Sequence, residues 1–285
     1  MGDEVVYQVE LDIFSGRPNP VWSLNAAEAA EFAQRLGDGT VPVVPVNVDS
    51  GQLGYRGYIM TATGHDADEL RRQGKATTFR VHAHMAQAGY DLAAEEFLLG
   101  ALERSDGVSE AEAGVLSEAV RWDLEESHPE VASAAAACSL LYTSWNDFSF
   151  WNGSRRPNNN CYNYAANYAS NTFAQPGRQG GGTFTQMTAA NIKAAMHRDG
   201  WRLDCIGGNL RVALVIWPGV DYHFYRQNLN GSTVRWCHKP GQTAARNTDN
   251  SGRYITNPQT CDRGNYTTWG GAHVFSNGVR SRTVR

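Results

Sequence analysis

Apolar and polar residues alternate in the first half of the chain in segments that predict both strands and helices. Three segments have the period of two that is typical of half-buried strands, namely residues 5–14, 53–61 and 77–85. Three others have helical spacing, namely residues 23–37, 91–102 and 109–122. The Gly- and Pro-rich residues 15–20 predict a turn, and the prolines within 41–48 confine that extended segment to a sheet edge or a loop. The Ala-rich residues 130–138 predict a connecting helix.

The pattern changes in the second half, where Asn, Gly, Tyr, Trp and Thr are frequent. Two helices are predicted there, over residues 161–169 and 188–198. Three closely spaced strands follow, over residues 211–217, 221–227 and 233–238. The fold class expected for the whole chain is therefore α+β.

Charge and cysteine content both change near residue 137 of the 285-residue chain. Residues 1–137 hold 23 Asp and Glu against 9 Lys and Arg, and the remainder holds 6 against 16, which gives net charges of −14 and +10. We expect an acidic α+β domain over residues 1–130, with a docking, targeting or regulatory role, and a basic domain over residues 138–285. This division allows two interpretations: the two halves attract each other, or the basic half faces an anionic partner. The alternative is that the charges only keep each domain surface soluble.

All five cysteines lie beyond this boundary, at Cys138, Cys161, Cys205, Cys237 and Cys261. An odd number leaves at least one free thiol, and the spacing does not fix how Cys138, Cys205, Cys237 and Cys261 pair. No CxxC spacing occurs, so we expect no structural zinc site. We also expect no other metal and no cofactor.

No apolar run is long enough to cross a bilayer, so we expect no membrane span. The N-terminal residues Met1–Glu4 are acidic and lack the basic start and apolar core of a secretory signal peptide. These features predict a cytoplasmic protein, with export by a dedicated secretion apparatus as the alternative.

Cys161 follows three asparagines, Asn158–Asn160, that can cap a helix. A thiol in the first turn of a helix lies at the positive end of the helix dipole, which favours the reactive thiolate. Exposed N–H groups there can also bind an oxyanion. The alternative is a buried cysteine that packs as a small apolar residue.

Two histidines lie on consecutive predicted strands downstream. His223 shares a strand face with Asp221 and Tyr225, and His238 shares a face with Trp236 on the next strand. A thiolate nucleophile needs an imidazole partner, and that imidazole needs a polar group to set its tautomer. Cys161, His223 and His238 supply these parts in order.

This order resembles the papain-like thiol hydrolases of the NlpC/P60 and CHAP type over roughly residues 140–240. Residues 213–219 (ALVIWPG), 221–227 (DYHFYRQ) and 235–241 (RWCHKPG) look like the strands around that family's histidine. The resemblance implies a papain-like domain with a helix-borne cysteine packed on an antiparallel sheet. It implies Cys161 as nucleophile, His223 as base and His238 as orienter. We expect oxyanion or substrate contacts from Asn159, Asn160, Tyr162, Asp221 and Trp236.

The function expected from this site is cysteine-dependent hydrolysis of a peptide or peptidoglycan-type amide, in a peptidase, amidase, effector or toxin. A protein partner bound through the N-terminal domain is a further expectation. One alternative is a non-enzymatic binding or structural protein with an aromatic-rich recognition surface. Another is an acyl transferase or deamidase that uses the same thiol.

Three weaker signals favour structural interpretations. His82 and His84 share a strand face, but no third metal ligand accompanies them. Residues 247–252 resemble the start of a calcium loop, but Pro258 stands where a bidentate Glu is required. The basic half carries tryptophans that could bind nucleic acid, among them Trp201, Trp217, Trp236 and Trp269, but no recognised motif or Lys-rich run supports this.

Overall fold

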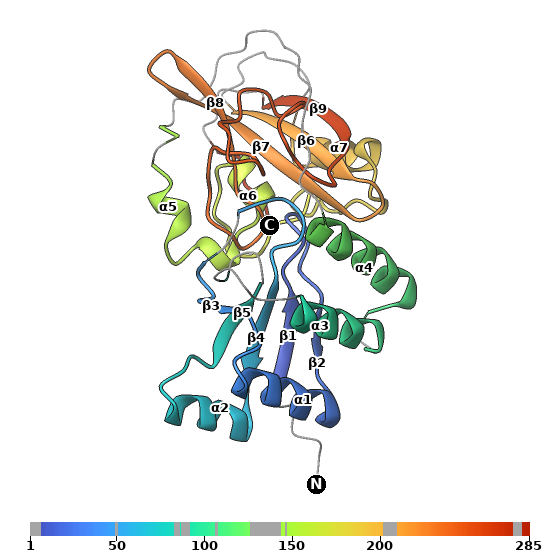
Figure 1. Cartoon of the computed structure of the whole chain (residues 1–285). Coiled ribbons are helices and arrows are strands. Elements are labelled where there is room, and N and C mark those ends of the chain that lie inside the picture. The colour runs from blue at the N-terminus through green and yellow to red at the C-terminus, as the bar shows by residue number, and fades with distance from the viewer. Residues whose placement is uncertain are drawn as a thin grey trace. The chain divides into compact units, whose positions relative to one another are not determined.

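The computed structural model describes residues 7–48, 51–82, 86, 92–105, 108–125, 144–145, 147–201, 210–275 and 281–285 (Figure 1). Helices and antiparallel sheets lie in separate segments, which confirms the predicted α+β class. The chain divides into two compact units. Unit 1 holds residues 1–13, 19–50 and 55–126, and unit 2 holds residues 14–18, 51–54 and 127–285. No helix in these described ranges is long and apolar enough to cross a membrane.

Unit 1 contains an antiparallel sheet with the strand order β2-β1-β4-β5-β3. Its strands are β1 (Tyr7–Leu11), β2 (Val21–Ser23), β3 (Val43–Val44), β4 (Tyr58–Ala62) and β5 (Thr78–Val81). Alternate residues of β1 and β4 are buried, as a sheet with one covered face requires.

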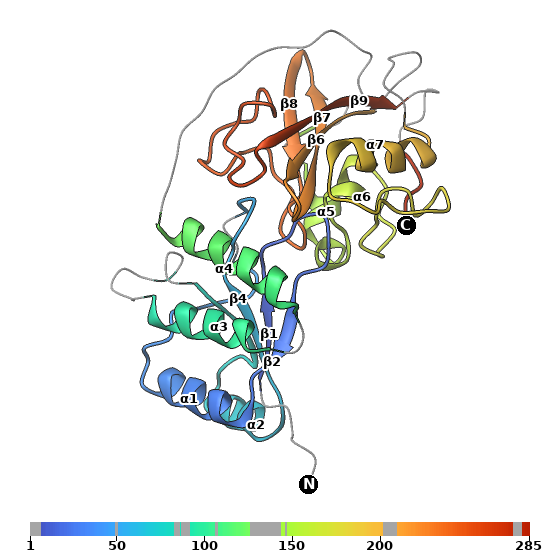
Figure 2. The ribbon, with the colours of Figure 1, turned by 90° about the vertical axis from the view of Figure 1, so that its right-hand side faces the viewer.

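Helices cover one face of this sheet (Figure 2). They are α1 (Ala26–Gly37), α2 (Gly64–Arg72), α3 (Ala93–Glu103) and α4 (Glu110–Glu125). Phe32 of α1 packs edge-on against Tyr7 of β1 and stacks on Phe79 of β5. The capping box of Asn25 and Glu28 starts α1, because each side chain accepts a backbone N–H of the other residue.

Two elements of unit 1 differ from the predicted ones. Strand β4 begins at Tyr58 instead of residue 53, because Gly57 has a φ of 95° and a Cβ there would lie 2.6 Å from the Val81 carbonyl oxygen. Helix α2 was not predicted. Its sequence is mostly polar, and the side chain of Thr63 makes no cap hydrogen bond at its start.

Unit 2 contains a second antiparallel sheet, with the order β8-β7-β6-β9. Its strands are β6 (Leu210–Trp217), β7 (Asp221–Asn230), β8 (Thr233–His238) and β9 (Thr268–Phe275). Strand β9 was not predicted, because Gly270 and Gly271 interrupt its apolar pattern. A Cβ at Gly270 would lie 2.6 Å from Cγ of Leu214, so a side chain there would prevent the pairing of β9 with β6.

Short helices and loops cover the two faces of this sheet (Figure 2). On one side lie α6 (Cys161–Ala165) and α7 (Ala189–Arg198), and the 239–267 segment lies on the other. Helix α5 (Ser149–Asn152) and the 3-10 turn Arg156–Asn158 precede α6. Helix α6 ends before the predicted residue 169, because Asn167 takes the left-handed conformation that stops helices. The helix predicted over residues 130–138 lies outside the described residues.

Candidate functional site

Cys161 is the first residue of α6, and its side chain is fully buried. Asn160 caps the helix, because its side-chain oxygen accepts the N–H groups of Tyr162 and Asn163, each at 3.1 Å. The Cys161 thiol donates to the Tyr222 carbonyl oxygen at 3.9 Å. Burial, reinforced by the nearby Asp221 carboxylate, raises the pKa of the Cys161 thiol well above its ordinary value. This thiol is therefore protonated at neutral pH, the opposite of what a nucleophile requires.

His223 and His238 lie on adjacent strands and face each other. Nε2 of His223 is 2.9 Å from Nδ1 of His238, and both side chains are fully buried. Nε2 of His238 lies 2.9 Å from the Thr248 carbonyl oxygen, which can only accept. His238 therefore carries its proton on Nε2, and in the neutral pair His223 donates to it. The rings of Tyr225 and Tyr266 pack against this pair.

The structure does not bring Cys161 onto the same side of the sheet as the histidines. Cys161 packs in one core with Tyr222 and Phe224. Those two residues alternate with His223 along β7, so their side chains leave the opposite face of the strand. The predicted Cys161–His223–His238 arrangement is thus corrected. The helix packs on the apolar face of β7, because that face carries the larger apolar side chains.

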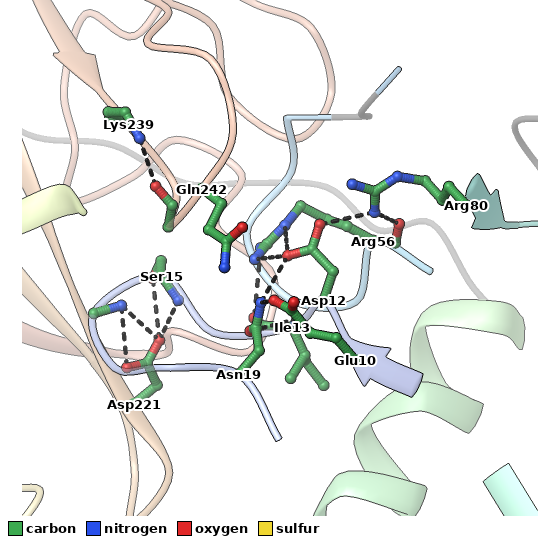
Figure 3. A network of polar contacts seen from close by, with 12 residues as sticks. Glu10, Asp12, Ile13, Ser15, Asn19, Arg56, Arg80, Asp221, Lys239 and Gln242 are labelled. Carbon is green, nitrogen blue, oxygen red and sulfur yellow. Dashed lines mark hydrogen bonds and ion pairs between the residues drawn. The ribbon is translucent and has the colours of Figure 1, made fainter. Parts of the chain in front are cut away.

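Asp221 has a role that the sequence did not reveal, because it binds the loop of residues 14–18 (Figure 3). Its Oδ2 accepts the Ser15 N–H at 2.7 Å, the Ser15 hydroxyl at 3.1 Å and the Tyr266 hydroxyl at 2.5 Å. Burial raises the pKa of Asp221, although these hydrogen bonds oppose the shift. A Cβ at Gly16 would lie 2.6 Å from the Tyr222 ring, so this close approach requires glycine.

The other predicted contact residues form hydrogen bonds inside unit 2. The Asn159 amide donates to the Arg155 carbonyl and to Asn171, and the Asn160 amide donates to the carbonyls of Gly16 and Ala174. The Tyr162 hydroxyl donates to Asp199 at 2.6 Å and accepts from Trp201. Trp236 is buried with the Arg211 guanidinium over its ring. These side chains hold loops in place and do not line an open site.

Lys239 was missed by sequence reasoning, although it directly follows His238. Its ammonium group is fully buried and donates to three carbonyl oxygens, those of Arg156, Asn159 and Gly241, at 2.5–2.7 Å. These contacts tie the end of β8 to the segment that precedes α6. A buried lysine in this sequence context gives no local pattern by which to find it.

Unit 1 holds a separate buried ionic cluster (Figure 3). The Asp12 carboxylate accepts from Arg56 and Arg80 at 2.7 Å each, and all three side chains are buried. Burial raises the pKa of Asp12, but the attraction of the two guanidinium groups outweighs it and holds the pKa well below its usual range. This cluster ties the end of β1 to β5 and to the segment before β4.

The residues that gave the weaker metal signals have other contacts in the structure. Nδ1 of His82 lies 3.4 Å from the buried Glu95 carboxylate, and His84 lies outside the described residues. Asp249 accepts the backbone N–H groups of Ser251 and Arg253, as in an Asx turn. Across the described ranges, no three His, Cys, Asp or Glu side chains gather as a metal site would need. Cys161, Cys237 and Cys261 are free thiols, and Cys138 and Cys205 lie outside the described residues.

Comparison with known proteins favours one of the functions that the sequence left open. The chain is 46% identical over 137 residues to a protein of Ruditapes philippinarum named insoluble matrix shell protein 1, and the match covers 88% of that protein. The chain belongs to the family of this protein. The match covers 47% of the chain. No protein-family model and no solved structure matches the chain, so the resemblance to papain-like thiol hydrolases stays a prediction.

This relationship corrects two expectations. The predicted function as a cysteine-dependent peptidase or amidase, with a peptide or peptidoglycan substrate and an effector or toxin role, is wrong, because the relative is named as a matrix protein. The predicted cytoplasmic location is also wrong, because a shell matrix lies outside cells. The non-enzymatic alternative fits the relationship better.

Proposed function

We propose that this chain is a non-enzymatic structural protein of an extracellular, insoluble matrix. Its relationship to the shell-matrix protein supports this role. The observation that carries the proposal is the complete burial of Cys161, His223 and His238, the three residues on which chemistry would depend. A reacting thiol must reach solvent and its base, and this thiol reaches neither.

In this role the buried polar groups fix the conformation of a segment that has little regular secondary structure. The 239–267 segment contains little regular structure, and buried side chains tether it at several points. His238 bonds the Thr248 carbonyl, Lys239 bonds the Gly241 carbonyl, and Tyr266 bonds Asp221. Such satisfied internal bonds rigidify segments that lack regular secondary structure.

Sequential extraction of the source tissue, followed by antibody detection, tests the proposal. We expect the protein outside cells, in the insoluble fraction that remains after washing with low-salt buffer and is released by denaturant. A Cys161→Ala chain that folds should partition in the same way as the wild type, because the thiol only packs. Recovery of the wild-type protein in the soluble cytosolic fraction would overturn the proposal.

A further inference from the structure

We propose that this protein associates head to tail with copies of itself, through an aromatic and arginine-rich surface on unit 2 that binds the acidic α3–α4 pair of another copy. The inference deepens the proposed matrix role by naming a partner. It rests on the charges of the two units and on the exposed side chains that each unit presents.

The surface on unit 2, called here the arginine–aromatic surface, consists of Trp145, Phe150, Arg155, Arg235 and Tyr254. The Arg235 guanidinium lies 5.6 Å from the ring centres of both Trp145 and Tyr254. The Arg155 guanidinium lies 4.2 Å from the ring centre of Phe150. These are cation–π distances, at which the rings hold the cations in place.

Two of the three aromatic side chains of this surface are exposed, and Trp145 is half-buried. Tyr254 is 63% exposed and Phe150 is 50% exposed, the two highest values among the large exposed hydrophobic residues of the described chain. Both parts of the surface rest on one small core, because Phe150 packs edge-on against the buried Trp151 and Trp145 packs on the same cluster. Exposed aromatic groups held beside arginines are typical of protein-binding surfaces.

Charge complementarity identifies the occupant. Unit 2 holds 17 Lys and Arg against 7 Asp and Glu, a net charge of +10, and unit 1 holds 8 against 22, a net charge of −14. A second copy therefore always brings a unit of opposite sign to the arginine–aromatic surface. Complementary charge speeds encounter and selects partners.

Within unit 1, the negative charge is concentrated on α3 and α4. These two helices pack together, and none of their described exposed side chains is a Lys or Arg, whereas α2 exposes Arg71 and Arg72. Glu96, Glu103 and Glu110 are exposed on this pair, as is Val115 at 44%. Exposed carboxylates on this pair complement the guanidinium groups of the arginine–aromatic surface.

When two copies bind through two different surfaces, the resulting pair keeps one free acidic surface and one free basic surface. Unless the rotation closes a ring, such heterologous contacts continue into open filaments. This geometry gives a route from a folded chain to an insoluble assembly without covalent bonds.

Sedimentation velocity of the full chain tests the inference. In about 0.01 M NaCl we expect masses well above the 31.3 kDa of the monomer, returning to monomer in about 1 M NaCl as the screening length falls from about 30 Å to about 3 Å. Arg155→Gln/Arg235→Gln should weaken association by about tenfold or more. Arg178→Gln/Arg285→Gln, which removes the same charge from exposed positions elsewhere on unit 2, should leave it unchanged.

Mixing two variants makes the test specific. Glu96→Gln/Glu103→Gln/Glu110→Gln lacks the acidic surface, and Arg155→Gln/Arg235→Gln lacks the basic one. Each alone should stay mostly monomeric, and a mixture should stop at one-to-one pairs, because only one productive contact remains. Glu31→Gln/Asp38→Asn/Asp68→Asn is the matched control, on α1, its C-cap and α2, and should assemble like the wild type.

Three results would overturn the inference: a wild type that is monomeric in low salt, an Arg155→Gln/Arg235→Gln variant that assembles normally, or two variants that do not pair. Circular dichroism of each variant shows whether it is folded, and the single variants Arg155→Gln and Arg235→Gln, tested separately, replace the double variant if that one unfolds. Matrix localisation without self-association would leave the proposed function standing. Self-association of a cytosolic protein would end the proposed function and leave this inference.

Discussion

The Sγ atom of Cys161 lies 3.9 Å from the carbonyl oxygen of Tyr222, the residue that directly precedes His223 in β7. The thiol therefore contacts the backbone of the histidine strand from the face that carries Tyr222 and Phe224. The His223 ring leaves the other face and contacts His238. Neighbouring residues of one strand thus belong to two separate environments, an apolar core and a polar histidine pair.

Cys161 should be inert in the folded protein. Because burial raises the pKa of its thiol, we expect iodoacetamide to label it only after unfolding in urea. Cys161→Ala should lower the free energy of unfolding by about 1–3 kcal/mol, since it leaves a small cavity in the core. Peptide mapping after labelling checks the first point, and the same peptide labelled in urea is the internal comparison. Rapid labelling of native Cys161 would contradict the described burial.

Unit 1 should lose stability in acid through Asp12. Its folded pKa lies below the unfolded value, so its contribution is complete above the unfolded pKa of about 3.9 and is lost as the pH falls below it. Asp12→Asn should cost about 3–5 kcal/mol at neutral pH, because Arg56 and Arg80 stay buried without their carboxylate. Urea unfolding from about pH 7 to about pH 3 measures both effects.

Asp68→Asn is the control for Asp12. Asp68 pairs with Arg71 on the exposed surface of α2, so its loss should change stability little at any pH. If Asp12→Asn is as mild as Asp68→Asn, the buried cluster does not stabilise the fold.

Lys239→Met should destabilise unit 2 by about 3 kcal/mol or more, because it leaves three buried carbonyl oxygens without their donor. Methionine has nearly the length of lysine, so the change tests the hydrogen bonds more than the packing. Thermal unfolding gives the measurement, and Lys193→Met, at a half-buried position on α7, is the comparison. Equal melting temperatures for the two variants would show that the buried ammonium contributes nothing.

Asn160→Ala should cost about 2–3 kcal/mol, because Asn160 both caps α6 and donates to the carbonyls of Gly16 and Ala174. Asn25→Ala removes a similar cap from the exposed start of α1 and should cost only about 1 kcal/mol. Asn160→Asp keeps the cap but turns a carboxylate toward two carbonyl oxygens. The loss in free energy of unfolding should therefore be smaller in acid, where the carboxyl group is protonated. Chemical unfolding at two pH values measures this loss, and an equal loss at both would contradict the prediction.

The sequence by itself determined the local features of this protein. The asparagine run before Cys161 predicts a capped helix start, because the cap forms between residues two and three positions apart. The period of two along β7 and β8 places His223 and His238 on one side of their hairpin. The division of charge along the chain is also readable directly from the residues.

Only the tertiary structure decided which face of β7 receives α6. Alternation defines two faces of a strand but does not say which one a distant helix covers, so the partner of Cys161 could not be predicted. The contact between Ser15 and Asp221 joins residues 206 positions apart, and no local pattern encodes it. The same applies to Lys239 and to β9, because their burial and pairing depend on chain that folds over them. Such long-range packing placed Cys161 away from the histidines and separated residues that a linear pattern had joined into one site.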